Sequence, residues 1–266
     1  MDIEATRTIA QDVKGRLLSD ILFGRLGPDD RLRLGPLCDA YEVGMSPMRE
    51  ALAQLVGRGF VIQDGQRGFR VAPVSRKELE DITATRIRLE SMALRDAVAF
   101  GDDDWEAGIL AAHHRLARRP RTADKLVDET WEQLHRRFHF ALIEACRSPW
   151  LLSFIDTLYD QFDRYRRLAV RESGRHPKIA NIHGELVDAV LAKNIARACS
   201  LLDSHIREAS TEVVLMGAAR LFDLASGEPA VAGIPLARSA TGSRPVRRRH
   251  HRRQRKRQSD RKGAQS

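Results

Sequence analysis

Apolar residues recur at helical spacing along most of the chain, and the pattern ends near Ala225. A first helix is predicted over residues 5–23, because an apolar residue returns there every four positions. The residues of that face are Ile9, Val13, Leu17 and Ile21. A shorter amphipathic segment covers residues 34–41, and residues 42–44 supply a turn after it.

The next helix is expected to open at Ser46 and Pro47. Serine can cap the free N–H groups of a helix N-terminus, and proline suits the first helical position. The apolar positions of this helix share one face: Met48, Ala51, Leu52 and Leu55. Gly57 and Gly59 mark its end, because glycine commonly terminates helices.

Two short apolar runs, residues 60–63 and 69–71, flank the turn-forming residues 64–68 and predict a β-hairpin. Helix, turn, helix and hairpin follow one another as in a winged helix-turn-helix, whose second helix enters a DNA major groove by its N-terminal end. A packing unit without any ligand would show the same order of elements. The pattern alone therefore leaves DNA binding and simple packing both open.

A second domain is predicted to begin at Ser75, which can cap a helix in capping-box spacing with Glu78. Long helical patterns with short connections then follow, as an antiparallel bundle requires. They cover residues 75–100, 102–118, 122–147, 150–172, 177–192 and 195–221. The fold class is thus mainly α. It comprises a winged helix-turn-helix domain over residues 5–74, an all-α antiparallel bundle over 75–221 and a disordered Arg-rich tail over 222–266.

The net charge of +9 belongs to that tail. From Arg244 to Ser266 there are eleven Lys and Arg residues against one Asp, so the remainder of the chain is close to neutral. The tail cannot bury a core, and we expect it to be disordered and to add non-specific affinity for nucleic acid. A nuclear-localisation signal has a similar appearance. The overall charge therefore says little about the two predicted domains.

The chain has no apolar run near 18 residues and no signal peptide, which predicts a soluble, cytoplasmic protein that does not enter a membrane. The three cysteines, Cys38, Cys146 and Cys199, lie apart in apolar helical patterns. They are expected to be core thiols in a reducing compartment, because their number and spacing suit neither a disulfide framework nor a thiolate metal site.

Four histidines of the predicted bundle are candidates for a metal site. His135 and His139 stand four residues apart, which places both on one face of a helix. His183 and His205 lie beside the apolar faces of two later predicted helices. Each one alone is best explained as a core histidine with a backbone partner. Together, on three helices of one bundle, they favour a site for a divalent metal.

The sequence resembles known proteins at two levels. The run GPDDRLRLGPLCDAYEVGMSPMREALAQLVGRGFVIQDGQRGFRV resembles the DNA-binding domain of the GntR family of bacterial transcription regulators, and the likeness extends over residues 9–74. The helical region is similar to the FCD (FadR C-terminal) ligand-binding domain of the FadR subfamily. The segments HRRFHFALIEACRSPWLL and LYDQFDRYRRL look most like the branch of carbon-starvation repressors that control glutarate and related acid metabolism.

The FCD resemblance implies a metal held by an Asp and three His residues. His139, His183 and His205 match the three histidines, and His135 stands where the family usually has Asp. Arg86 matches the arginine of the R-x-x-L-E segment, which often faces the effector. Imidazole ligands suit zinc, with nickel or iron as alternatives, and the absence of a carboxylate leaves a +2 charge to attract an anionic effector.

The GntR resemblance also implies which residues touch DNA. The family commonly has Ser or Thr and then Arg where this chain has Gly44 and Met45. Contacts are therefore expected from Ser46 and Arg49 and from the wing. The wing residues are Gln66, Arg67 and Gly68, and Arg31 and Arg33 are candidates for backbone contacts. The cluster of Arg164, Arg166 and Arg167 either binds the acid or faces solvent, and exposure is the expectation for most of it.

These observations predict a homodimeric transcription regulator, most simply a repressor and not an enzyme. It would bind a double-stranded DNA operator, and a small carboxylic acid at the metal would control its affinity. One alternative is a metal-responsive regulator with no organic effector. Another is a metal-dependent hydrolase, which the pattern disfavours because no general base accompanies the histidines as in H-E-x-x-H.

Overall fold

The computed structural model describes residues 8–63, 65, 68–119, 128–174, 182–217 and 222. Every described residue lies in one compact unit, Met1–Leu236. The predicted Arg-rich tail, apart from Phe222, lies outside the described residues. No helix in the described part of the chain combines the length and the apolar character needed to cross a membrane.

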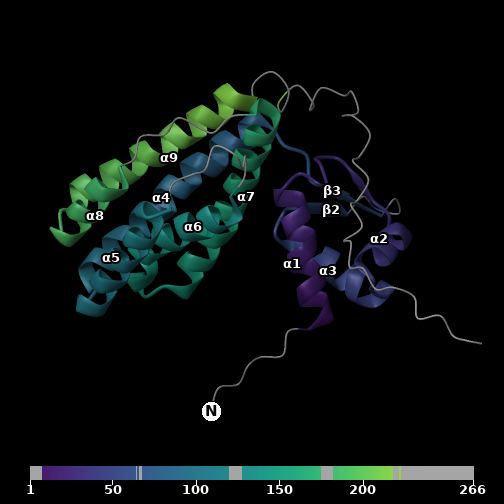
Figure 1. The fold of residues 1–266 in the computed structure, drawn as a ribbon, viewed down its shortest axis with the longest axis horizontal. Helices are drawn as coiled ribbons and strands as arrows, with labels where there is room; N and C mark the ends of the chain where they lie inside the picture. The colour runs from purple at the N-terminus through teal and green to yellow at the C-terminus, as the bar shows by residue number, and fades with distance from the viewer. Residues whose placement is uncertain are drawn as a thin grey trace, which may run out of the picture. The chain divides into compact units, whose positions relative to one another are not determined.

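The N-terminal domain is a winged helix-turn-helix with a small antiparallel sheet in the strand order β1-β3-β2 (Figure 1). Its elements are α1 (Ile9–Leu22), β1 (Arg31–Leu32), α2 (Leu34–Tyr41), α3 (Met45–Gly57), β2 (Val61–Gln63) and β3 (Phe69–Val71). The apolar faces of α1 and α3 pack on one another and on Phe60 and Val71 to form a closed core. The predicted helices and hairpin are thereby confirmed.

Two helix starts of this domain differ from the prediction. Helix α1 begins at Ile9, after Thr8, which caps it in a reciprocal pair with Gln11, and residues 5–7 of the predicted helix lie outside the described residues. Helix α3 begins at Met45 after Gly44, whose backbone is extended and whose cap position has no side-chain bond. Ser46 is therefore not the cap. Pro47 tolerates a place deeper in the first turn because the first four N–H groups of a helix have no intrahelical partner.

Strand β1 was not predicted from the sequence. It has two residues, too few for an alternating pattern, and it exists because β3 offers a free edge. Arg31 pairs with Arg70 across that edge, so the wing hairpin becomes a three-stranded sheet.

The second domain is helical throughout its described residues. Its elements are α4 (Arg76–Phe100), α5 (Asp103–Ala117), α6 (Glu129–Ile143), the short 3-10 helix η2 (Glu144–Cys146), α7 (Pro149–Ser173), α8 (His183–Leu191) and α9 (Ile195–Gly217). Helices α4, α7 and α9 pack against one another, and α5 packs on α6 and α8 (Figure 1). Helix α4 runs without interruption, and Ser75 caps it as predicted. Helices α6 and α8 begin later than predicted, after Asp128 and Ile182, and the residues before these two positions, 120–127 and 175–181, lie outside the described residues.

The middle of helix α7 is buried although it carries several charged side chains. Two apolar cores lie in the helical domain, one around α4, α5, α6, α8 and α9 and a smaller one around α4, α7 and α9. Between them α7 contributes a continuous buried run from Tyr159 to Val170 that includes two aspartates and three arginines. Such a helix is buried all round, so its charges must find partners inside the protein.

Candidate metal centre and nucleic-acid interface

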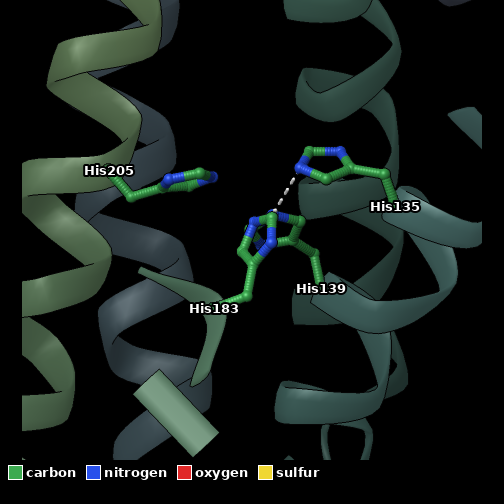
Figure 2. A group of neighbouring side chains, drawn as sticks. All are labelled: His135, His139, His183 and His205. Carbon is green, nitrogen blue, oxygen red and sulfur yellow. Dashed lines mark hydrogen bonds between the residues drawn. The ribbon is translucent and has the colours of Figure 1, made fainter. Parts of the chain in front are cut away.

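The four candidate histidines converge on one point in the helical domain, as predicted (Figure 2). Helix α6 supplies His135 and His139, α8 begins at His183, and α9 supplies His205. One nitrogen of each ring lies within 4.8 Å of a nitrogen of every other. The spacing of four residues on α6 and the inward faces of α8 and α9 therefore bring three helices to a common centre.

The ring of His135 is held in place from two sides. Its Nδ1 lies 3.1 Å from the Tyr159 hydroxyl, and its Nε2 lies 3.1 Å from Nε2 of His139. The Trp131 ring stacks on it with 4.7 Å between centroids and 17° between planes. The hydroxyl fixes which nitrogen faces the centre, an arrangement typical of histidines that bind metals. Neither Tyr159 nor Trp131 was singled out from the sequence.

Burial and mutual proximity keep the rings of His135 and His139 neutral. Burial, followed by the neighbouring histidines, lowers the pKa of His135 and His139 well below the usual value. Arg166 contributes to the lowered pKa of His135, and Arg86 to that of His139. Neutral imidazole is the form that donates a lone pair to a metal ion. The environment thus prepares the rings as ligands.

The residues present fit a divalent transition metal. Two nitrogens that each lie about 2.0–2.1 Å from one zinc ion are about 3 Å apart, close to the 3.1 Å between the Nε2 atoms of His135 and His139. His139 is 5% exposed, and its Nδ1 has no hydrogen-bond partner among the residues that the structure describes. A buried polar atom without a partner is unfavourable unless another interaction compensates. Four nitrogen donors without a carboxylate suit zinc, nickel or iron better than calcium or magnesium.

Arg86 lies in the same interior region, as expected for an effector-binding residue, but it already has a partner. Its Nε donates to Glu90 Oε1 at 2.8 Å, and both side chains are buried. Its guanidinium also lies over the rings of Tyr159 and Phe162, at 5.0 and 4.6 Å from their centroids. The glutamate of the R-x-x-L-E segment therefore orients the arginine, a role that the i, i+4 spacing could have indicated.

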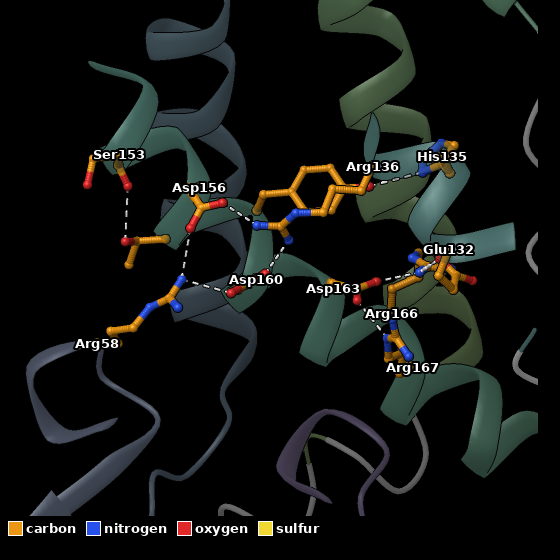
Figure 3. A network of polar contacts seen from close by, with 12 residues as sticks. Arg58, Glu132, His135, Arg136, Ser153, Asp156, Asp160, Asp163, Arg166 and Arg167 are labelled. Atoms are coloured by element: carbon orange, nitrogen blue, oxygen red, sulfur yellow. Dashed lines mark hydrogen bonds and ion pairs between the residues drawn. The ribbon is translucent and has the colours of Figure 1, made fainter. Parts of the chain in front are cut away.

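The expected exposure of Arg164, Arg166 and Arg167 was wrong. The three side chains are between 1% and 8% exposed. Arg166 binds Glu132 of α6 through two nitrogens and also Asp163, and Asp163 binds Arg167 at 2.6 Å (Figure 3). Spacing along α7 could have indicated the pairs with Asp163, but it could not reveal the partner Glu132, which comes from another helix. These charges hold α6 against α7 beside the histidine cluster.

The predicted DNA-contacting residues lie in the winged domain. Ser46 and Arg49 are exposed in the first half of α3. Arg31 and Arg33 are exposed at β1 and just before α2. Gly68 precedes β3 with a φ of 93°, which glycine adopts at low cost. Gln66 and Arg67 of the wing lie outside the described residues. The first residue of α3, Met45, is also exposed and presents an apolar side chain there.

Comparison with known proteins supports both domain assignments. Residues 9–71 match the bacterial regulatory proteins of the gntR family, and residues 81–208 match the FCD domain. The chain is 40% identical over 216 residues to an uncharacterized HTH-type transcriptional regulator, BphR, from Paraburkholderia xenovorans, with 80% of this chain and 87% of the relative covered. It is 37% identical over 196 residues to the HTH-type transcriptional repressor GlaR of Escherichia coli, with 71% and 89% covered.

Solved structures agree on the fold. Escherichia coli McbR/YncC has a TM-score of 0.61 at 20% identity, with 78% of this chain and 98% of that chain covered. A GntR-type regulator from Rhodococcus sp. RHA1 has a TM-score of 0.61 at 22% identity, with 79% and 99% covered. The relatives are regulators of transcription, which argues against the hydrolase alternative. The chain belongs to the GntR family as a DNA-binding transcription regulator with an FCD domain.

Proposed function

We propose that this regulator is a repressor whose operator affinity depends on a divalent metal held by His135, His139, His183 and His205 and on a small carboxylic acid bound beside it. The single observation that carries the proposal is the convergence of four imidazoles from three helices on one centre. Such a centre serves no purpose in packing, since apolar side chains would fill it at lower cost. The repressor assignment is supported by the name of the relative GlaR.

The metal, when bound, would supply a positively charged Lewis-acid position for a carboxylate oxygen. The chain's own residues define the rest of the acid-binding site. Arg86 offers a buried guanidinium that Glu90 orients and that two aromatic rings flank. The Nη groups of a guanidinium can donate to a further carboxylate in a charge-assisted, directional way. Arg166 is already engaged by Glu132 and Asp163 and is assigned to structure.

In the DNA-binding half, the exposed N-terminal turns of α3 would enter the major groove, with Arg49 and Ser46 as the contacting residues. Gln66, Arg67 and Gly68 would contact the flanking groove or backbone through the wing, and Arg31 and Arg33 would contact phosphates. A homodimer would present two such units to a palindromic operator, as two-fold symmetric regulators do. Binding of the acid would change the affinity for the operator by a coupling of about 1–3 kcal/mol.

The test begins with bound-metal analysis and a thermal-shift screen. Purified protein is stripped with a chelator, reloaded with zinc, nickel or iron(II), and then screened with mono-, di- and hydroxycarboxylic acids. Linkage predicts that an acid present at 100 times its Kd raises the free energy of unfolding by about 2.7 kcal/mol. His139→Ala should abolish metal-dependent stabilisation. His114→Ala, at a histidine of α5 outside the cluster, should not.

Operator binding then separates the alternatives. A duplex enriched from a random pool by the metal-loaded protein serves as the probe. A change in affinity on adding the stabilising acid supports the proposal. A change with metal alone, and none with any acid, would instead establish a metal-responsive regulator. Failure of all four histidine positions to bind metal would refute the metal site itself.

A further inference from the structure

Helix α7 carries a ring of alternating charges between the two domains (Figure 3). Asp156 and Asp160 stand one helical turn apart, and each is shared by the same two arginines. Arg58, just after α3, binds Asp156 at 3.1 Å and Asp160 at 2.8 Å through Nη2. Arg136 of α6 binds the same two aspartates through their other carboxylate oxygens. Two positive and two negative charges therefore close a balanced ring.

One side of this ring ends at the DNA-reading helix. Arg58 is the C-cap residue of α3, and its backbone carbonyl accepts a hydrogen bond from Gln161 Nε2 at 2.7 Å. A Cβ at Gly59 would lie only 3.2 Å from that nitrogen, so the Gln161 side chain approaches the backbone at Gly59 closely. Three side chains of α7 thus hold the C-terminal end of the helix whose other end faces DNA.

The other side of the ring ends at the histidine cluster. Arg136 follows His135 directly in α6, and its guanidinium lies over the rings of Tyr159 and Phe140, at 5.0 and 5.2 Å from their centroids. Tyr159 in turn contacts Nδ1 of His135. Both the backbone of α6 and the ring of Tyr159 therefore connect a candidate metal ligand to the arginine that shares Asp156 and Asp160.

We infer that Arg136 and Arg58 are positioning residues through which the state of the histidine cluster sets the tilt of α3. Any displacement of His135 moves Arg136 relative to the two aspartates, and the aspartates redistribute their contacts between Arg136 and Arg58. A 13-residue helix is about 20 Å long, so a tilt of about 5° at its C-terminal end shifts its N-terminal end by about 1.7 Å. A shift of that size is enough to break direct contacts with base edges.

The ion pairs of the ring are exposed enough to exchange partners at little cost. Asp156 and the two arginines keep between 26% and 41% of their side-chain surface exposed, whereas Asp160 keeps 9%. Partly exposed ion pairs contribute little net stability, so exchanging one partner for the other costs little. The inward Asp160 acts as the fixed centre around which both arginines are arranged.

This inference rests on the proposed function, because it requires that ligands of the histidine cluster alter DNA affinity. The experiment measures the operator Kd of full-length protein in three states: chelator-treated, zinc-loaded, and zinc-loaded with the acid that raises the melting temperature most. The variants are Arg136→Gln and Arg58→Gln. The matched control is Arg137→Gln, which removes a neighbouring, exposed arginine whose ion pair with Glu144 is 3.8 Å long. Zinc affinity is measured for each protein by competition with a chromophoric chelator.

In the wild type the Kd should change between states by about 5–150-fold. In Arg136→Gln and Arg58→Gln the change should fall to about twofold or less, while each protein still binds zinc. Arg137→Gln should respond as the wild type does. Should Arg136→Gln fail to fold or to bind zinc, Arg58→Gln decides, because it lies in the other domain and far from the ligands in sequence.

Three outcomes count against these ideas and can be told apart. If the wild-type Kd is the same in all three states, the proposed function is wrong. If the wild type responds and Arg58→Gln keeps the full response, the coupling through the ring is wrong. An equal loss of affinity in every state for Arg58→Gln would mark that residue as merely structural and would overturn the inference as well.

Discussion

Removing one oxygen atom from the helical domain should weaken the metal centre while leaving the fold intact. In Tyr159→Phe the ring remains, together with its contacts to the guanidinium groups of Arg86 and Arg136. The substitution removes the hydroxyl that lies 3.1 Å from Nδ1 of His135. With Nε2 of His135 as the metal ligand, Nδ1 would carry the proton and its N–H would donate a hydrogen bond to this oxygen. Burial raises the pKa of Tyr159, so the hydroxyl is neutral at any physiological pH.

The expected loss follows from what the His135 ring then lacks. Its N–H remains enclosed without an acceptor, and the orientation of the ring is no longer fixed. Removal of such outer partners typically costs about 10–100-fold in metal affinity. That range corresponds to about 1.4–2.7 kcal/mol. The metal-free protein should lose only one hydrogen bond, about 0.5–1.5 kcal/mol in its free energy of unfolding.

The assay pairs a zinc competition titration with chemical denaturation of the metal-free protein. Tyr165→Phe is the matched control on the same helix. Its hydroxyl accepts the Ser75 N–H at 3.0 Å and donates to Glu78, away from the cluster. The control should lose stability but no zinc affinity. A zinc affinity of Tyr159→Phe within about twofold of the wild type, or an equal loss of zinc affinity in Tyr165→Phe, would refute the role of the Tyr159 hydroxyl in orienting His135.

Two further predictions concern the DNA-reading helix and the packing of the bundle. Arg49→Ala should cost about 1–3 kcal/mol of specific operator binding in a fluorescence anisotropy titration. The control Arg76→Ala changes an exposed arginine on α4 and should leave operator binding unchanged. Equal operator affinities of the two variants would disprove the groove assignment. Gly101→Ala should lower the free energy of unfolding by about 1–3 kcal/mol, because a methyl group there would overlap the Trp105 ring. The control is Gly57→Ala, at the end of α3, where nothing lies close to the added methyl group. By chemical denaturation it should be neutral or raise the free energy of unfolding by up to about 1 kcal/mol. A loss as large as that of Gly101→Ala would contradict the packing argument.

Much of the fold was accessible from the sequence because periodicity directly reports which face is buried. The faces of α1 and α3 and the run of long helices follow from apolar spacing alone. The convergence of the four histidines was also predictable, because each lies on or beside such a face. These features depend on local pattern, which a single chain displays in full.

The remaining features depend on partners that are distant in sequence. Glu132 and Arg166 meet only once α6 and α7 are packed, so exposure was expected for Arg166 from its residue type alone. The two-residue β1 exists only because β3 provides an edge. The start of α3 at Met45 and not at Ser46 shows the limit of local rules, since a glycine in extended conformation displaced the expected serine cap. Tyr159 gives no signal of its role until its hydroxyl is seen beside His135.

The buried charges between α6 and α7 restrict how this bundle can vary over evolution. Sliding one helix past the other by a turn would displace Glu132 by about 5.4 Å and leave the buried Arg166 with Asp163 as its carboxylate partner. Losing one partner of a buried ion pair costs about 3–5 kcal/mol, far more than repacking an apolar interface between two helices would cost. The register of the helix that carries His135 and His139 is therefore set by the buried Glu132–Arg166 ion pair and not by the fit of apolar side chains. Descendants should accordingly exchange Glu132 and Arg166 together, or retain both.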